Sequence, residues 1–310
     1  MNFTFIIICA HIIQPVINHW RFSVSITTIS GKGEKGFEPF TEMIMKVKAW
    51  TVLPMLAYLT ACAAPGTEKY QTSMDSVTAE KVSRIIQSDV IPYKGENHGE
   101  VISRVSSAFL GTPYQADTLI GGPGTPEALV ANFNGVDCFT LADYVEALAR
   151  SDDQKSFLHN LARTRYTAGN VDYLSRRHFF SDWFATAPRN ARDVTPDISP
   201  DYVVVDKQLN RKPDGGEYIP GLGIHPRKIN YIPGKALNQQ VMDNLKNGDY
   251  IGVYSPLDGL DVSHVGIVVR YDGQVWFRNA SSLAANRKVV DSPFMEYMHS
   301  KPGIVVLRAE

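Results

Sequence analysis

The feature that most constrains the fold is a hairpin signal near the C-terminus. His264–Arg270 and Gln274–Asn279 are rich in β-branched and aromatic side chains, and the turn signal Tyr271-Asp272-Gly273 separates them. Two further runs, Asp249–Tyr254 and Gly303–Leu307, have the same strand-like composition. The C-terminal part of the chain is therefore predicted to be rich in antiparallel β-structure.

This hairpin places His264 and Asn279 on one face of the predicted sheet. If Asp272-Gly273 is a two-residue turn, His264 faces Ser281 and Asn279 is its diagonal neighbour. If the turn is centred on Tyr271-Asp272, His264 faces Asn279 directly. Both registers keep the two side chains on one face, because side chains alternate along a strand. An imidazole beside an amide is the base and orienting group of a Cys-His-Asn triad, whereas a strand histidine and a strand-end asparagine are the structural alternatives.

A cysteine lies at the start of a predicted helix in the middle of the chain. Apolar residues recur at helical spacing from about Phe139 onward, at Leu141, Tyr144, Val145 and Leu148. Asp137 and Cys138 stand at the beginning of this segment. The N–H groups and dipole at a helix N-terminus favour a thiolate, so Cys138 is a candidate nucleophile. The alternative is a small buried apolar residue, the commoner role of cysteine.

The N-terminal fifth of the chain is predicted to lie outside the fold. The apolar run Phe5–Ile13 is too short to span a bilayer. A second run begins at Met45, where Lys46 and Lys48 precede the apolar stretch Ala49–Leu59, and it ends at Cys62. A charged start followed by a short apolar core is typical of a signal peptide, and an ordinary apolar helix is the alternative.

The sequence Leu59-Thr60-Ala61-Cys62 resembles a bacterial lipobox, in which the cysteine is lipidated and becomes the mature N-terminus. We therefore expect residues 1–42 to be an upstream extension, residues 43–62 to be a lipoprotein signal peptide and residues 63–76 to be a tether. Ala63 follows the cysteine, a pattern typical of outer-membrane sorting in Gram-negative lipoproteins. The expected location is the cell envelope, lipid-anchored on the periplasmic face of the outer membrane.

Residues 77–310 are predicted to form a single catalytic domain. Val77–Gln87 and Glu100–Leu110 have the periodicity of amphipathic helices, and Ile120–Pro126 has loop composition throughout. Residues 152–240 show a mixed pattern, in which Tyr202–Val205 is a candidate strand. We interpret this region as an insertion that covers or shapes a groove.

Composition argues against several classes of function. The 310 residues contain 31 Lys and Arg and 32 Asp and Glu, so there is no basic excess to indicate a nucleic-acid partner. The other histidines, including His178 and His225, lack H-x-x-x-H spacing and cysteine partners. We therefore expect no metal and no cofactor.

The order of four short motifs resembles the NlpC-type, papain-like murein hydrolases. These motifs are LGTPY at 110–114, Asp137-Cys138, GDYI at 248–251 and HVGI at 264–267. Three other stretches resemble the N-acetylmuramoyl-L-alanine amidase-like branch of that superfamily: HFFSDW at 178–183, GLDVSHVGIVV from Gly259, and RNASS from Arg278. The likeness covers most of the chain from about Val77 onward.

The resemblance implies an α+β fold of the papain-like type, with the nucleophile helix packed on a central antiparallel sheet and a long insertion between them. It implies Cys138 as nucleophile, His264 as base and Asn279 as the orienting residue. Tyr114 matches the family's active-site tyrosine, and the backbone N–H of Cys138 is the expected second oxyanion donor. Further candidates for substrate or oxyanion contacts are Asp137, Ser263, Asp182 and Trp183.

Two positions depart from the family pattern. The family more often has histidine where Asn279 stands, although an amide can also orient an imidazole. The Ser or Thr that usually follows the nucleophile is Phe139, which would alter the substrate pocket.

The predicted reaction is hydrolysis of the N-acetylmuramoyl–L-Ala amide of peptidoglycan through a thioester. Cleavage between γ-D-Glu and a diamino acid is the alternative within the same fold. A non-catalytic peptidoglycan-binding lipoprotein, or an acyl-transfer or lipid-deacylating enzyme, would belong to another class. The expected partners are peptidoglycan or muropeptides and, through the lipid anchor, a membrane; the protein is expected to be a monomer.

Overall fold

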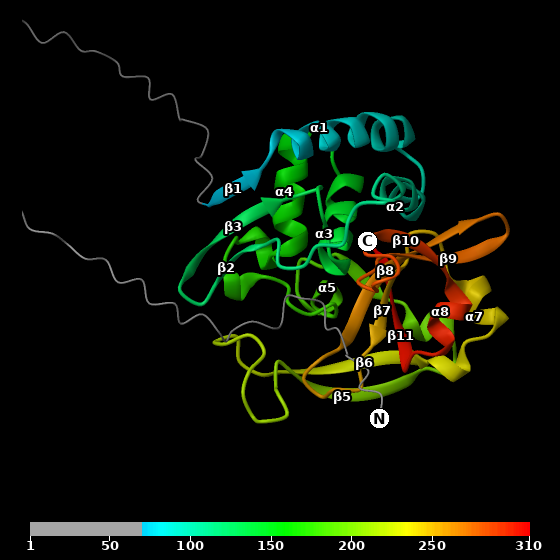
Figure 1. Cartoon of the computed structure of the whole chain (residues 1–310). Helices are drawn as coiled ribbons and strands as arrows, with labels where there is room; N and C mark the ends of the chain where they lie inside the picture. The colour runs from blue at the N-terminus through cyan, green and yellow to red at the C-terminus, as the bar shows by residue number, and fades with distance from the viewer. Residues whose placement is uncertain (1–69) are drawn as a thin grey trace, which may run out of the picture. The chain divides into compact units, whose positions relative to one another are not determined.

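An antiparallel sheet of eight strands forms the centre of the computed structural model, which describes residues 70–310 (Figure 1). The strand order is β10-β9-β8-β7-β11-β6-β5, and β4 pairs with the last residues of β11. The strands are β4 (Ala191–Asp193), β5 (Val203–Leu209), β6 (His225–Pro233), β7 (Tyr250–Tyr254), β8 (Val262–Tyr271), β9 (Gln274–Ala280), β10 (Val289–Pro293) and β11 (Gly303–Ala309). The predicted α+β class and the antiparallel sheet are confirmed.

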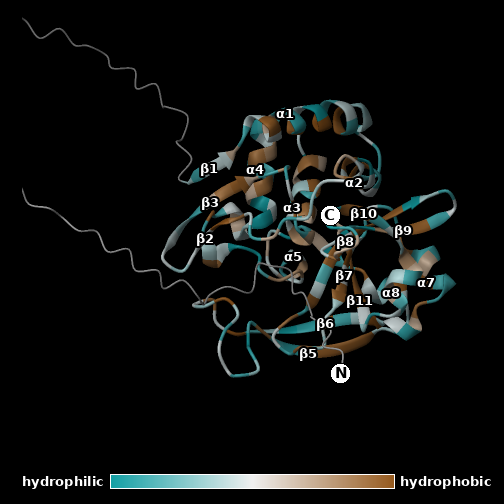
Figure 2. Ribbon diagram, viewed as in Figure 1, coloured by the Kyte–Doolittle hydropathy of each residue, from teal (hydrophilic) through white to brown (hydrophobic). Residues whose placement is uncertain are grey.

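The central strands are apolar on both faces because helices cover both sides of the sheet. Along β11, Val305 and Leu307 belong to one apolar cluster, whereas Ile304 and Val306 belong to another. This alternation follows from the two-residue period of a strand. Figure 2 shows the resulting apolar colouring of β7 and β11. The sequences of the strands at the centre of the sheet are therefore continuous hydrophobic runs.

The first helical layer consists of α1 (Ser76–Ile85), η1 (Ile86–Val90), η2 (Ile91–Tyr93), α2 (His98–Ser107), α3 (Cys138–Ala149) and α4 (Gln154–Arg165). Every residue of α3 is buried, and this helix packs against α2, α4 and strand β8. The second layer contains α6 (Thr195–Ile198), η5 (Gly234–Ala236), α7 (Gln239–Asn244) and α8 (Phe294–His299). Three short helices complete the described chain: η3 (Thr167–Gly169), η4 (Tyr173–Ser175) and α5 (Asp182–Ala185).

A smaller sheet of three strands has the order β1-β3-β2. It contains β1 (Gln71–Met74), β2 (Ile120–Gly122) and β3 (Thr125–Ala131). The prediction that residues 120–126 form a loop throughout is therefore wrong, because a tight turn at Pro123-Gly124 joins two strands. The run Ile-Gly-Gly has too few side chains to show the alternation that marks a strand.

The helices predicted around residues 77–87 and 100–110 are confirmed, as are the four C-terminal strands. The predicted strand at 202–205 is the start of the longer β5. The region 152–240 contributes β4, β5 and β6 to the main sheet, where β6 and β4 both pair with β11. This region therefore completes the sheet as well as covering it.

The expected extension at 1–42, the signal peptide at 43–62 and its lipidated Cys62 lie outside the described residues. Of the predicted tether, residues 71–74 form β1 and pair in parallel with β3. Within residues 70–310, no helix has the combined length and apolar character needed to cross a membrane.

Candidate active site

Helix α3 begins at Cys138 because Asp137 caps it. Asp137 Oδ1 accepts hydrogen bonds from the backbone N–H groups of Phe139 (3.0 Å) and Thr140 (2.8 Å). Thr140 Oγ1 in turn accepts from the N–H of Asp137 at 3.0 Å, which completes a capping box. Asp137 is fully buried. The cap fixes Cys138 as the first helical residue, at the positive end of the helix dipole.

Cys138 is only 1% exposed and belongs to the apolar cluster on the α3 side of the sheet. A nucleophilic role requires the reduced thiolate. Any activity of this residue therefore depends on the redox state of the protein.

The β8–β9 hairpin brings His264 to Asn279 in the first of the two predicted registers. Tyr271 pairs with Gln274, and Asp272-Gly273 forms the two-residue turn, both residues having positive φ. Asn279 is thus the diagonal neighbour of His264, and its Oδ1 lies 3.0 Å from His264 Nε2. Pairing of β7 with β8 is irregular next to Val253, which faces His264. Such bulges can redirect a side chain near a site.

The side chain of Asn279 is held in one orientation. It is 1% exposed, and its Nδ2 donates to the carbonyl of Phe277 (3.1 Å) and lies 3.4 Å from Ser292 Oγ. A carbonyl can only accept a hydrogen bond, so Nδ2 must point toward Phe277 and Oδ1 toward His264. His264 Nε2 is then the protonated nitrogen in the neutral ring. The lone pair that can accept a proton is therefore on Nδ1.

His264 is half-buried between aromatic rings. The ring of Phe277 lies edge-on at 5.8 Å, and that of Tyr297 is tilted at 6.4 Å. Burial lowers the pKa of His264 below its ordinary value, and the charge of Lys301 lowers it further. The hydrogen bond that His264 donates to Asn279 and the charge of the Asp137 carboxylate oppose this shift. The neutral, proton-accepting form therefore predominates at neutral pH.

Tyr114 lies beside the start of α3. It bridges Val136 in a parallel sense, and its N–H donates to the carbonyl of Arg287 at 2.9 Å. The guanidinium of Arg287 lies 5.1 Å from the centre of the tyrosine ring. Burial raises the pKa of Tyr114, the Asp137 carboxylate raises it further, and Arg287 opposes them. Asp137 thus acts electrostatically on both Tyr114 and His264, which connects the helix start, this loop and the hairpin.

The other predicted site residues have different surroundings. Ser263 precedes His264 in β8, and its hydroxyl lies 3.4 Å from the carbonyl of Val253. Asp182 accepts from the N–H of Phe179 at 3.0 Å and from Arg227 at 3.0 Å. Its carboxylate therefore stabilises the local turn and its contact with β6.

Trp183 is fully buried, with its ring 4.8 Å from that of Tyr250 and 6.2 Å from that of Phe139. This places Trp183 in the core rather than on a surface that a substrate can reach. Phe139 also contacts Phe180, so the residue that replaces the family's Ser or Thr packs on the HFFSDW segment.

Sequence reasoning missed the residues around His264 and Asn279 that come from β10 and the C-terminal region. Ser292, Tyr297 and Lys301 follow the hairpin by ten or more residues, and no motif marks them. It also missed Asp261, which is buried just before β8 and accepts from the N–H of Ser181 at 2.7 Å. A buried acidic residue before a strand has no pattern that distinguishes it from a turn residue.

The N-acetylmuramoyl-L-alanine amidase-like family (AmiA-like) has a model that matches residues 104–304. The chain belongs to this family. The matched segment includes Tyr114, Cys138, His264 and Asn279. No protein among the curated sequences matches the chain.

Solved structures resemble this fold. An N-acetylmuramoyl-L-alanine amidase from Bacteroides uniformis is 30% identical, with a TM-score of 0.56 over 69% of this chain and 99% of that one. Protein LPG0564 from Legionella pneumophila gives a TM-score of 0.63 over 75% of this chain and 94% of that one, but at 21% identity the likeness concerns the fold alone. A proposed xylanase from Bacteroides fragilis is also 30% identical, with a TM-score of 0.52 over 66% of this chain and 98% of that one.

Proposed function

We propose that this protein hydrolyses the N-acetylmuramoyl–L-Ala amide bond of peptidoglycan or its fragments, with Cys138 as nucleophile. The observation that carries the proposal is the 3.0 Å contact between His264 Nε2 and Asn279 Oδ1. Both residues lie in the segment that the family model matches, and in this chain that segment also carries Cys138 at a capped helix start. The Bacteroides uniformis structures, named for this activity, support the choice of bond. The proposal includes a papain-like arrangement of these groups.

In the proposed reaction His264 Nδ1 removes the proton of the Cys138 thiol. The thiolate attacks the lactyl carbonyl carbon, and the resulting tetrahedral intermediate collapses as His264 returns the proton to the leaving amine of L-Ala. A thioester remains on Cys138. Water, deprotonated by His264, then attacks the thioester and releases the muramic acid carboxylate and the thiol.

The developing oxyanion needs donors at the start of α3. The backbone N–H of Cys138 belongs to the first helical turn, where the helix dipole favours negative charge. Tyr114 keeps its proton at neutral pH because its pKa is raised, so that its hydroxyl can donate a hydrogen bond. We assign these two groups to the oxyanion and Asn279 to the orientation of His264.

The proposed site of action is the periplasmic face of the outer membrane, through lipidation of Cys62. The motif at residues 59–62 supports this assignment. In cells, a Cys62→Ala variant should leave the detergent-extracted membrane fraction. Retention of the variant in that fraction would rule out the lipid anchor.

The proposed function is tested by digesting purified muropeptides with reduced protein and weighing the products. A disaccharide without peptide, together with a free stem peptide, is the expected result. A disaccharide that still carries L-Ala-D-Glu would instead indicate the γ-D-Glu–diamino acid bond. Binding without cleavage under reducing conditions would indicate a peptidoglycan-binding protein. Release of reducing sugar ends alone would favour a glycosidase.

A further inference from the structure

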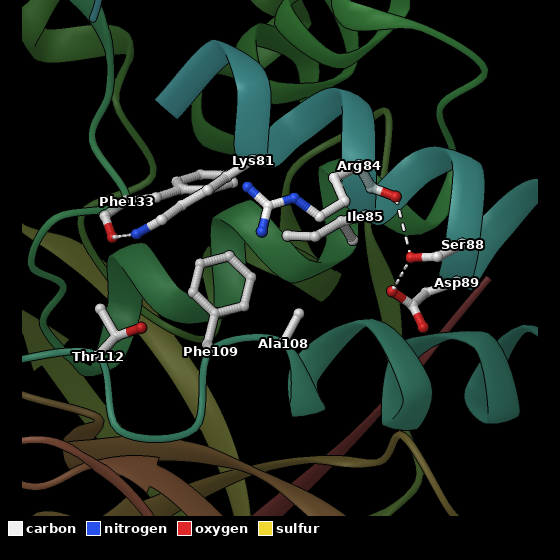
Figure 3. A pocket seen from close by; sticks show the side chains of 9 residues that line it. All are labelled: Lys81, Arg84, Ile85, Ser88, Asp89, Ala108, Phe109, Thr112 and Phe133. Carbon is white, nitrogen blue, oxygen red and sulfur yellow. Dashed lines mark hydrogen bonds between the residues drawn. The ribbon is translucent and has the colours of Figure 1, made fainter. Parts of the chain in front are cut away.

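A groove lies between α1 and the end of α2 (Figure 3). It has a volume of about 280 Å³. Its floor is apolar and includes Ile85, Phe109 and Phe133. Its rim carries three charged side chains, Lys81, Arg84 and Asp89. The groove thus combines an apolar floor with charges of both signs.

The charges are separated along the groove. Figure 3 shows the cationic ends of Lys81 and Arg84 on the side of Phe109, while Asp89 lies toward the opposite end. Lys81 Nζ donates to the carbonyl of Phe133 at 3.3 Å, and Asp89 Oδ2 accepts from Ser88 Oγ at 2.6 Å. These bonds leave further capacity, since an ammonium has three donors and a carboxylate several acceptor positions.

Nearby acidic groups interact only weakly with Lys81 and Arg84. Arg84 Nη2 lies 3.5 Å from Glu80, but both side chains are largely exposed, and such pairs contribute little. Lys81 acts on Asp75 only through its charge. A bound carboxylate can therefore compete for both cations.

The cationic end of the groove is the end nearer the proposed site. Thr112 lines the groove and lies two residues before Tyr114, about 7 Å along an extended chain. Thr112 accepts from the N–H of Val289, the first residue of β10, and Tyr114 donates to the carbonyl of Arg287, just before that strand. From Thr112 outward, the order of charged groups is therefore Lys81 and Arg84 first and Asp89 last.

The far end of the groove is built on an unusual helix. After α1, residues Ile86–Val90 continue as a π-helix, which carries Ser88 and Asp89 to the rim. π-helical turns are rare in proteins as a whole, and those that occur are often found at functional sites. Each such turn displaces the side chains that follow it around the helix. This backbone feature is independent of the charge pattern.

We propose that the groove binds the stem peptide of the muropeptide, with the α-carboxylate of D-Glu on Lys81 and Arg84 and an ammonium group of the diamino acid on Asp89. This inference rests on the proposed function. The stem peptide runs from L-Ala through D-Glu to the diamino acid, so its carboxylate precedes its ammonium, in the same order as the groove. Arg84 and Asp89 are five residues apart, about 7.5 Å along a helix, which is close to the span of two extended residues.

The test measures binding to the full-length Cys138→Ala variant by calorimetry, so that no substrate is consumed. Two muropeptides are compared. One contains D-Glu with a free α-carboxylate, and the other contains the α-amide, D-isoglutamine, at the same position. We expect the amide to bind about fivefold more weakly, because it lacks the charge that Lys81 and Arg84 pair with, and pairs at exposed positions are each worth at most about 1 kcal/mol. Adding Lys81→Ala and Arg84→Ala should abolish this difference, whereas Lys155→Ala, at an exposed position on α4, should preserve it.

A third ligand tests the other end of the groove. Asp89→Asn should weaken binding of the muropeptide that contains the diamino acid and leave a muropeptide ending at D-Glu unaffected. Equal binding of the acidic and amidated ligands by the protein with an unaltered groove overturns the inference, whatever the variants do. Turnover by the reduced wild-type protein is measured separately. If it cleaves neither ligand, the proposed function fails while the binding comparison still decides the inference.

Discussion

The two ends of helix α3 carry different polar groups. Its first residue is Cys138, which follows the capping carboxylate of Asp137, whereas its last turn carries the buried carboxylate of Glu146. Cys138 and Glu146 lie about 12 Å apart along the helix axis. Glu146 Oε1 is bound by His98 (3.2 Å) and Arg150 (2.5 Å), and its Oε2 by the hydroxyl of Tyr250 (2.9 Å). Partners from α2, α3 and β7 thus converge on one carboxylate.

The difference concerns what each buried polar group is arranged to do. At the end of α3, both oxygens of Glu146 are occupied, and the result is a tie between two helices and the sheet. At the start, the carboxylate of Asp137 caps the helix and acts through its charge on Tyr114 and His264. We therefore expect substitutions at the end of α3 to change stability and substitutions at the start to change activity.

The largest expected effect is on turnover. Cys138→Ala should reduce muropeptide hydrolysis by reduced protein at least about 1,000-fold, because it removes the nucleophile. Thermal denaturation of the reduced proteins should show a comparatively small change. Turnover retained by the variant would contradict the assignment of Cys138, and a large loss of stability would erase the contrast between the two ends.

Glu146→Gln should reduce the free energy of unfolding by about 2 kcal/mol, because it removes a buried charge that accepts hydrogen bonds from the partly exposed Arg150 and His98. Urea denaturation measures this change. Asp152→Asn, which affects an exposed pair with Lys94, is the control and should stay within about 0.5 kcal/mol of the wild type. The specific activity of folded Glu146→Gln protein should be close to that of the wild type.

The stability of the wild type should also depend on pH through Glu146. Burial alone would raise the pKa of Glu146, but the hydrogen bonds and charges of His98 and Arg150 outweigh it and hold the pKa below its ordinary value. A lowered carboxyl pKa stabilises the fold above the ordinary pKa, and this contribution is lost as the pH falls through the folded-state value. The melting temperature of Glu146→Gln should therefore fall less steeply in acid. A parallel decline in both proteins would argue against this role.

Asn279→Ala should lower kcat by about 10- to 100-fold, because the imidazole loses the group that fixes its tautomer. Asn279→His should recover much of the activity, since a histidine can also orient the ring. Steady-state kinetics under reducing conditions distinguishes the two variants. Equal loss in both would indicate a packing defect rather than a positioning role.

The smallest expected effect is on pH dependence. Lys301→Gln removes a charge that lowers the pKa of His264, so that pKa should rise toward its ordinary value. The acidic limb of the profile of kcat/KM against pH should then move to higher pH, with the maximum rate nearly unchanged. A shift to lower pH would contradict the assignment of this limb to His264.

Local patterns were enough to predict the parts of the site that depend on short-range geometry. The two-residue side-chain period of strands predicted that His264 and Asn279 share a face, and the apolar periodicity after Phe139 predicted where α3 begins. Neither inference needs knowledge of distant contacts. The register itself was left open between two turns, and the structure adopts the Asp272-Gly273 turn.

Long-range packing could not be predicted in the same way. Strand β1 pairs in parallel with β3, more than fifty residues later, and nothing in Gln71–Met74 indicates that partner. Glu146 is buried, and its partners His98 and Tyr250 come from α2 and β7, which no local pattern around residue 146 indicates. Trp183 was expected at a substrate surface because of its motif, but the aromatic cluster buries it.

Strands β6 and β4 lie along the same side of β11, opposite β7. Both strands come from residues 152–240, so deleting that region would expose a row of unpaired N–H and C=O groups on β11. An exposed edge of this kind, lined by Ile304, Val305 and Val306, is a template for strand addition between molecules. A shortened protein should therefore self-associate before its hydrolytic activity can be measured. This region is a poor choice for truncation when relatives are prepared for crystallisation.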